Sequence, residues 1–322
     1  MEEIITVIQC VLVLGLFMTA GFITVKTGYI SKDAASSVSK IVTRLMFPAW
    51  LASKLLSENI TVQQITEQLP LFAVGAIITL ALLGLGLFFA WISKADGARK
   101  YVLYALCSAP NAIFLGLPIC QGLFGDEGSL SCTILALGSD LVSWTLTITL
   151  MAMGGEKLSG ERKARGIHIN PVTVVFIISF ILKMLGFNLP EFIQAPLYKF
   201  GSALSYLAMI YLGMMLVDAD IRGVFRDKIT YFFVPLKCLV IPFVLGIAIA
   251  MTGLFSFVQI CVITIVFAAS PMISMTVFYR EYGLDHVFGN SVTFICVILN
   301  IATIPFIYWS VSTLIKLMGL AI

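Results

Sequence analysis

Residues 107–118 read Cys-Ser-Ala-Pro-Asn-Ala-Ile-Phe-Leu-Gly-Leu-Pro, with two prolines and a glycine inside an otherwise apolar segment. Each proline removes a backbone N–H and clashes with the preceding turn of a helix. In lipid the freed carbonyls need other partners, so a broken helix is expected only where it lines a cavity or is buried in protein. The stretch therefore predicts an interrupted helix, and the rest of the chain indicates the kind of protein around it.

The composition excludes a soluble protein. Hydrophobic residues make up 60% of the 322 residues and charged residues only 11%, whereas soluble domains average about 25% charged residues. The net charge of +3 is scattered along the chain, which argues against a nucleic-acid partner. The seven cysteines form no C-x-x-C pair, so no metal site is expected. We therefore predict an all-α polytopic membrane protein whose partner is the lipid bilayer.

A helix that crosses a bilayer needs about 20 apolar residues. We place ten transmembrane helices at residues 5–25, 34–56, 69–93, 100–123, 130–153, 171–187, 194–217, 229–252, 256–279 and 290–318. The loops after odd-numbered spans carry basic residues, whereas the loops after even-numbered spans carry only acidic charges. Because short cytoplasmic loops are rich in Lys and Arg, we expect a multi-pass protein of the plasma (inner) membrane with both termini extracytoplasmic.

A second interruption, Ala-Ala-Ser-Pro-Met-Ile-Ser at residues 268–274, lies in the ninth span. Five plus five spans make an inverted repeat, with repeat one at 1–153, a cytoplasmic loop at 154–169 and repeat two at 170–322. Matching breaks in inverted halves indicate a midplane binding site, where helix N-termini suit a carboxylate. Prolines also kink packed membrane helices without binding anything. The candidate substrate-binding residues are Ser108, Pro110, Asn111, Gly116, Pro118, Ser270, Pro271 and Ser274.

Three polar residues lie deep in other spans: Asp140 in the fifth, Lys237 in the eighth and Asn300 in the tenth. Polar groups inside a membrane are functional candidates by default, and these three are candidates for coupling transport to H+ or Na+. Lys237 is expected to prefer a carboxylate partner, for which Asp140 is the candidate. The structural alternatives are a hydrogen bond from Asp140 to a broken helix and helix association through Asn300.

Pro110-Asn111, Gly116-Leu117-Pro118 and Phe124-Gly125 resemble the P-N-x-x-x-x-G-x-P…[FY]-G signature of the auxin efflux carrier family. Residues 278–283 resemble the exit from its second crossover helix, and further matches extend over the whole chain. The chain lacks the long central loop of plant members, so it looks like a short bacterial-type member, related in fold to plant auxin carriers and bile acid–sodium symporters. The resemblance implies crossover helices 4 and 9, a scaffold of spans 1, 2, 6 and 7, a transport domain of spans 3–5 and 8–10, and a homodimer.

These observations predict a secondary transporter of a small carboxylate, such as a malate-like, malonate-like or auxin-like acid. The resemblance implies elevator-type alternating access, and H+ or Na+ is the expected coupling ion. The alternative is a membrane sensor, built on a carrier fold, that binds a small acid without transporting it. An enzyme is disfavoured, because the chain has no H-E-x-x-H motif and neither histidine lies deep in a span. No catalytic residue and no organic cofactor are therefore expected.

Overall fold

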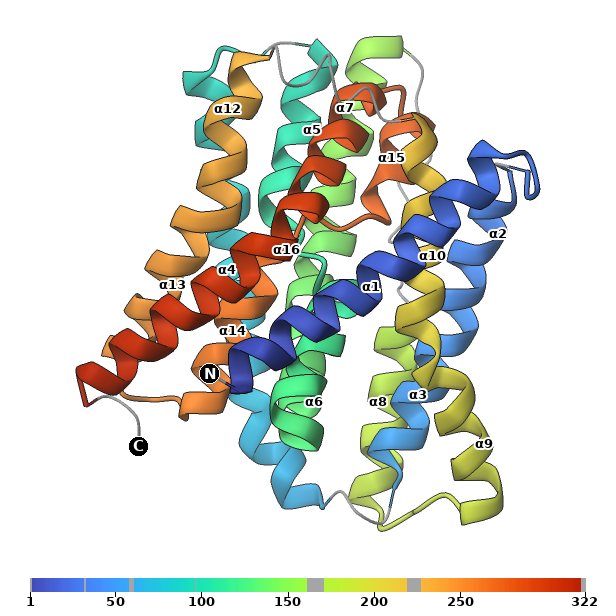
Figure 1. Cartoon of the computed structure of the whole chain (residues 1–322), viewed down its shortest axis with the longest axis vertical. Coiled ribbons are helices and arrows are strands. Elements are labelled where there is room, and N and C mark those ends of the chain that lie inside the picture. The colour runs from blue at the N-terminus through green and yellow to red at the C-terminus, as the bar shows by residue number, and fades with distance from the viewer. Residues whose placement is uncertain are drawn as a thin grey trace. The chain divides into compact units, whose positions relative to one another are not determined.

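The part of the chain that the structure describes is mainly helical. The computed structural model describes residues 2–31, 33–57, 61–95, 97–160, 171–218 and 227–319. Over these ranges the backbone forms helices and no β-strand, which confirms the all-α prediction (Figure 1). The one strand-like feature there is an isolated antiparallel bridge between Pro110 and Pro271.

The chain divides into two compact units. Unit 1 comprises residues 1–12, 71–167 and 218–322, and unit 2 comprises residues 13–70 and 168–217. Two helices pass from one unit to the other: α1 (Glu2–Lys26) and α4 (Val62–Ile92). The division in α4 falls at Pro70, the proline inside that helix.

Unit 2 is built around α3, and all of its elements are given next in chain order. They are α2 (Ala34–Ile41), η1 (Val42–Met46), α3 (Phe47–Leu55), α8 (Pro171–Met184), α9 (Glu191–Ser202) and α10 (Leu204–Met215), with the short η4 (Leu216–Asp218) at its edge. α3 packs against α8 and α9. α1 and α10 approach closely, because a Cβ built on Gly21 would lie 2.0 Å from the carbonyl oxygen of Ile210. Small residues allow such backbone contact between membrane helices.

Unit 1 holds the remaining helices of the described ranges. They are α5 (Gly97–Ser108), η2 (Ala112–Gly116), α6 (Leu117–Val142), η3 (Ser143–Thr147), α7 (Ile148–Ser159), α12 (Lys228–Pro235), η5 (Leu236–Val240), α13 (Ile241–Met251), α14 (Phe257–Ala268), α15 (Met275–Glu281) and α16 (His286–Leu317). α14 lies at the centre and packs against α6, α13 and α16. α16 runs obliquely across the other helices of this unit (Figure 1).

Wide π-helical turns recur before prolines. η1, η2 and η5 are π-helical, and each is followed within two residues by a proline: Pro48, Pro118 and Pro242. A proline lacks the N–H that an α-turn would use and clashes with the carbonyl one turn back. A wider turn moves that carbonyl away. The helix therefore continues through these prolines.

Among the described residues, four helical stretches are long and apolar enough to cross a membrane: Val62–Ile92, Ala112–Ser159, Lys228–Met251 and His286–Leu317. Shorter apolar helices lie at Gly15–Lys26, Val174–Met184 and Phe257–Ala268. The longest stretch covers the second half of the predicted fourth span and the whole fifth. It bends at Gly125, whose φ of 58° is not helical. A polytopic membrane protein accounts for these helices, while the count of ten spans and the orientation stay predictions.

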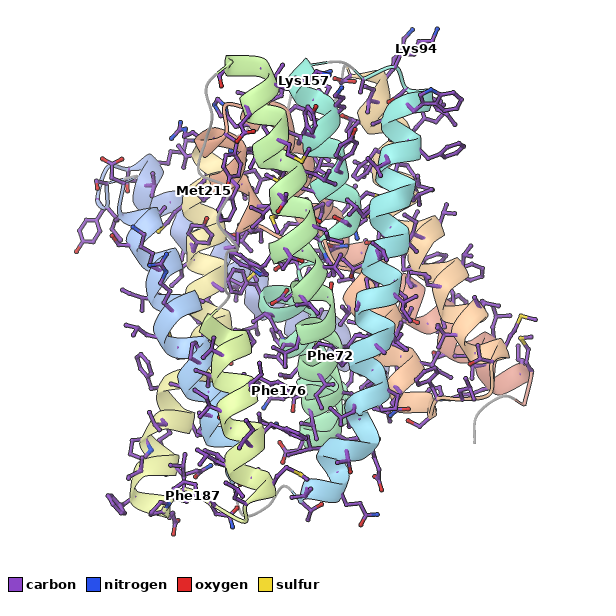
Figure 2. All side chains as sticks on the ribbon, turned by 180° about the vertical axis from the view of Figure 1, so that it is seen from behind. Phe72, Lys94, Lys157, Phe176, Phe187 and Met215 are labelled. Atoms are coloured by element: carbon purple, nitrogen blue, oxygen red, sulfur yellow. The ribbon has the colours of Figure 1, made fainter. Side chains whose placement is uncertain are left out.

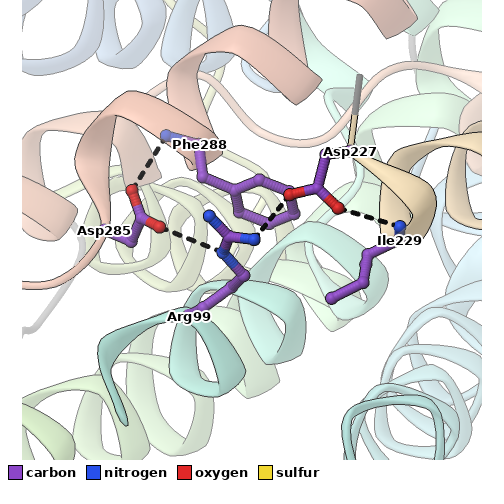
Figure 3. Close-up of polar contacts among 5 residues, drawn as sticks. All are labelled: Arg99, Asp227, Ile229, Asp285 and Phe288. Atoms are coloured by element: carbon purple, nitrogen blue, oxygen red, sulfur yellow. Dashed lines mark hydrogen bonds and ion pairs between the residues drawn. The ribbon is translucent and has the colours of Figure 1, made fainter. Parts of the chain in front are cut away.

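At one end of unit 1 an arginine joins three helix starts (Figure 3). Arg99, near the start of α5, donates to Asp227 and, over 3.1 Å, to Asp285. Both carboxylates are also N-caps, since Asp227 accepts from the amide of Ile229 and Asp285 from that of Phe288. One side chain thus connects the starts of α5, α12 and α16.

Candidate functional site

The two interrupted helices cross each other at their breaks. The first break separates α5 from η2 and the second separates α14 from α15. The amide of Asn111 donates to the carbonyl of Ser270 over 2.8 Å, and the amide of Met272 donates to the carbonyl of Ala109 over 2.8 Å. The two segments therefore pair as a short antiparallel bridge. In it, each break donates one backbone hydrogen bond to the other.

The side chain of Asn111 joins this crossing. Its Nδ2 donates to Ser270 Oγ over 3.3 Å, and the residue is almost fully buried. Asn111 has φ −82° and ψ 59°, and it stands as the N-cap of η2 without a side-chain hydrogen bond to that helix. The side-chain amide is therefore held at the start of a helix by its hydrogen bond to Ser270.

The end of α14 is held by two side chains from neighbouring elements. Lys237 Nζ, carried by η5, donates to the carbonyl of Phe267 over 3.4 Å. Asn300 Nδ2, carried by α16, donates to the carbonyl of Ala268 over 2.9 Å. The last carbonyls of a helix have no partner within it, and a cation there is favoured by the helix dipole. Lys237 and Asn300 thus complete the helix end that the second break leaves open.

One polar atom beside the end of α14 has no hydrogen-bond partner in the described part of the chain. Asn300 is fully buried, and its Oδ1 accepts no hydrogen bond, while its Nδ2 reaches both Ala268 and Thr303. Buried acceptors are nearly always satisfied by protein, water or a bound group. This oxygen could accept a hydrogen bond from a donor or bind a cation.

The crossing places the start of one helix near the end of another. η2 starts at Ala112, directly after its N-cap Asn111, and continues into α6 at Leu117, so the amide end of a helix lies at the crossing. Such an end favours an anion. The buried amino group of Lys237 lies at the second break instead, where it donates to the carbonyl of Phe267. The helix start after Asn111 therefore suits an anionic group, whereas Asn300 Oδ1, at the second break, suits a hydrogen-bond donor or a cation.

The structure brings only part of the predicted set together. Pro110, Asn111, Ser270 and Pro271 form the bridge itself. Gly116 lies beside it, where a Cβ would come within 3.3 Å of Val266 in α14. These five residues, with Lys237 and Asn300 at the end of α14, make up the crossing cluster.

The other predicted residues have different surroundings. Ser108 Oγ donates to the carbonyl of Tyr104 over 2.8 Å and lies 3.1 Å from Thr147 Oγ1, so its hydroxyl joins α5 to η3. Ser274 is half-buried just before α15. Pro118 does not open the helix as expected, because helical dihedrals run through Gly116 and Leu117 and the wide turn of η2 accommodates the ring.

Asp140 lies in the last turns of α6 and is almost fully buried. Its neighbour Ser139 shares a hydrogen bond of 2.7 Å with Thr79 of α4. The two helices touch closely there, since a Cβ built on Gly138 would lie 1.9 Å from the carbonyl oxygen of Phe72. The candidate coupling carboxyl therefore lies in the part of α6 that contacts α4 through Gly138 and Ser139.

Two contributors escaped the sequence reasoning. Thr147 and Thr303 hold Ser108 and Asn300 in place. A threonine in an apolar helix is common, and no pattern singles it out. Asp227 and Asp285 did carry a signal, because each precedes a helix as an N-cap does.

Comparison with known proteins places this architecture among transporters. The family model described as "Membrane transport protein" matches residues 6–168 and 161–308. An uncharacterized transporter of Methanothermobacter thermautotrophicus is 26% identical over 302 residues, which cover 90% of this chain and 93% of that protein. An uncharacterized transporter of Methanocaldococcus jannaschii is 27% identical over 231 residues, which cover 69% of this chain and 73% of that protein.

Proposed function

Since the chain belongs to the membrane transport protein family, that of the auxin efflux carriers, we propose that it is a secondary transporter of a small organic anion. The observation that carries the proposal is the crossing of the two broken helices at Pro110 and Pro271. Broken helices that meet in this way form substrate sites in secondary transporters. A family of transporters is in general not enzymatic, which agrees with the expectation of no catalytic residue.

The chemistry of the crossing favours a carboxylate as substrate. Asn111 offers an amide at a helix start, and Lys237 would supply a buried positive charge at the end of α14, before the second break. Malate-like, malonate-like and auxin-like acids all carry the group that these donors would bind. In this proposal Ser108, Ser274 and Pro118 shape the surroundings of the site, whereas Asn111 contacts the substrate.

Coupling is proposed to use H+ or Na+. Asp140 is the residue that would bind a proton, because it is a buried carboxyl in the same unit as the crossing. Asn300 Oδ1 is the oxygen that would join the carbonyls of a broken helix around Na+, since unwound carbonyls bind such ions in other transporters. Sodium dependence and proton dependence of the flux distinguish the two.

The remaining architecture follows as part of the same proposal. Ten spans in two inverted halves, extracytoplasmic termini and a homodimer in the plasma (inner) membrane are its elements. Unit 1 contains the predicted transport spans and unit 2 the predicted scaffold spans, apart from chain ends of α1 and α4. This agreement supports an elevator mechanism in which unit 1 carries the substrate.

Flux into liposomes tests the proposal. The purified protein is reconstituted, loaded with one unlabelled acid, and diluted into a trace of the labelled acid, with malate, malonate, an aromatic acid and an amino acid compared. Saturable counterflow of a carboxylate that Asn111→Ala weakens is the expected result. The control is Asn290→Ala, a buried asparagine of α16 outside the crossing cluster.

Two outcomes contradict the proposal. Saturable binding of an acid with no flux in either direction would favour the sensor on a carrier fold. Flux that Asn111→Ala and Asn290→Ala alter equally would remove the crossing from the substrate path, because both variants would then act only through folding.

A further inference from the structure

A small pocket opens on the surface of unit 1 where α4 ends and α5 begins. Its volume is about 310 Å³, and its lining comprises Leu87, Ala90, Trp91, Lys94, Ala95, Lys100 and Tyr104. Two lysines, two aromatic rings and aliphatic side chains thus face one space. We infer that this pocket binds the phosphate headgroup of an anionic phospholipid, with the aromatic and aliphatic wall against the acyl chains.

The charges in the pocket are available to a ligand. In the described ranges neither Lys94 nor Lys100 has a carboxylate partner, and the one contact of the Lys100 ammonium is with the ring of Tyr101, 5.0 Å from its centroid. The neighbouring Arg99 differs, because its guanidinium is taken up by Asp227 and Asp285. The junction in Figure 3 therefore neutralises one cation at this end and leaves two for the pocket.

The backbone at Lys94 is in a conformation that a lysine adopts at a cost. The amide of Lys94 donates to the carbonyl of Trp91 and the amide of Ala95 to that of Ala90, which is a Schellman cap. Lys94 has a φ of 51° at the position where glycine is usual. The left-handed conformation disfavours any residue with a Cβ. A lysine at this position costs backbone free energy, but it places an amino group in the lining of the pocket.

The wall has the composition of a membrane interface. Trp91 is 75% exposed and Leu87 is 42% exposed, so both present apolar surface outward. Tryptophan and tyrosine gather at the level of lipid headgroups, and basic pockets on the cytoplasmic side bind anionic headgroups. The predicted orientation puts this loop on the cytoplasmic side. Figure 2 shows Lys94 projecting from the end of α4, with Lys157 at the same end of unit 1.

Native mass spectrometry of the delipidated full-length protein in a neutral detergent tests the inference. Short-chain phosphatidylglycerol and phosphatidylcholine are titrated separately, and bound lipid is counted by mass. We expect phosphatidylglycerol to bind at least about tenfold more tightly, and Lys94→Gly with Lys100→Gln to weaken it about 25-fold, since each basic residue near a membrane surface contributes roughly a factor of five. Phosphatidylcholine binding should stay unchanged.

Two further variants separate lost binding from lost folding. Lys94→Gly alone keeps the cap and relieves the left-handed backbone, so its melting temperature without lipid should equal or exceed that of the wild type while its phosphatidylglycerol binding falls. Lys157→Gln removes an exposed lysine outside the pocket lining and should leave binding unchanged. A phosphatidylglycerol preference that survives the double substitution would overturn the inference.

A last arm distinguishes a lipid from a free anion. Inorganic phosphate and glycerol phosphate at millimolar concentration should not displace phosphatidylglycerol, because they lack the acyl chains that the aromatic wall would contact. Displacement by either anion with the same dependence on Lys94 and Lys100 would assign the pocket to a soluble phosphate and contradict the lipid assignment. Equal binding of the two lipids would contradict it as well.

Discussion

The two broken helices meet at one crossing but are held there by different means. The first break is short, and its backbone groups pair with the second break through Ala109 and Asn111. The second break is longer, and the helix end before it is completed by side chains from elsewhere, Lys237 and Asn300. The first break thus contributes the side chain of Asn111 to the crossing. The second break is held in position by the side chains of Lys237 and Asn300, which belong to other helices.

This difference separates two kinds of substitution. A change at Asn111 removes a donor from the crossing and leaves both helix ends paired. A change at Lys237 or Asn300 leaves buried carbonyls of α14 without a partner, which costs stability because an unpaired buried acceptor is expensive. Affinity for substrate should therefore depend on Asn111 and on the charge of Lys237, whereas the hydrogen bonds of Lys237 and Asn300 to the end of α14 should matter mostly for stability.

The largest effect is expected from Lys237→Met, which removes the charge and nearly keeps the volume. Carboxylate flux should fall on the order of a hundredfold, since an ammonium in a low-dielectric site interacts with an anion by several kcal/mol. Flux in liposomes and the melting temperature in detergent measure the effect. Lys183→Met is the matched control, because Lys183 is also buried and donates to a carbonyl, that of Ser57, but belongs to unit 2.

Lys237 also acts through its charge if Lys237→Met and Lys183→Met lower the melting temperature by similar amounts but only Lys237→Met lowers flux on the order of a hundredfold. Equal loss of flux and melting temperature in Lys237→Met and Lys183→Met would mean that Lys237 serves the fold alone, and the comparison of the breaks would lose its electrostatic part.

Asn111→Ala is expected to raise the substrate concentration for half-maximal flux about tenfold or more, since a hydrogen bond to a charged group contributes roughly 1.5–3 kcal/mol. The melting temperature should change little, because the backbone bridge does not use this side chain. Concentration-dependent flux is the measurement. Unchanged half-saturation would place substrate recognition outside the first break.

Asp140→Asn tests a carboxyl that belongs to neither break. If Asp140 carries the coupling proton, flux driven by a pH gradient should lose its dependence on that gradient, while counterflow between equal concentrations of acid persists. The amide is nearly isosteric, so the α4–α6 contact should remain. Gradient dependence identical to that of the wild type would assign proton coupling to another group.

Asn300→Leu removes both donors that reach Ala268 and Thr303. The free energy of unfolding should fall by about 1–3 kcal/mol, the cost of leaving a buried acceptor unpaired. Half-saturation should stay within about twofold, because hydrogen bonds away from the ligand act through the fold. A tenfold loss of affinity without loss of stability would contradict the division of roles between the breaks. Dependence of flux on Na+ in the same variant tests its Oδ1 as an ion ligand.

The smallest effect is expected from Arg99→Gln, at the junction near the starts of α5 and α16. The ion pairs there are partly exposed, with 37% of the arginine side chain accessible, so their loss should cost no more than about 1 kcal/mol. Chemical denaturation measures it, with Lys100→Gln as the neighbouring control. A loss several times larger would show that the crossing depends on this junction as well.

The crossing was predictable because proline acts on its own helix. Pro110 and Pro271 remove donors at known positions, and their placement in corresponding spans already pointed to a shared site. The family and its transporter character were predictable for the same reason, since the motif around Asn111 is local. Pro118 shows the limit of this reasoning: a proline predicts a break only if the turn before it keeps its α-helical width, and η2 does not.

The partners of the deep polar residues were less predictable. Lys237 was expected to seek a carboxylate, and the hydrogen bond described for it goes to the carbonyl of Phe267. Burial and depth can be estimated from an apolar segment, but the direction of a long side chain depends on helix packing. Thr147 and Thr303 illustrate the same point, because their role depends only on which neighbour they meet.

The wide turns before prolines shift the angular phase of their helices. Each α-helical residue advances the chain by about 100°, so Lys40 and Lys54 would fall within about 40° of each other on a regular helix. Between them lies η1, and an extra residue in its turn rotates the later segment by about another 100°. Lys40 is exposed and Lys54 is buried. A helical wheel drawn across Pro48, Pro118 or Pro242 would thus assign the later residues to the wrong face, and a one-residue deletion in such a turn should turn the next segment over.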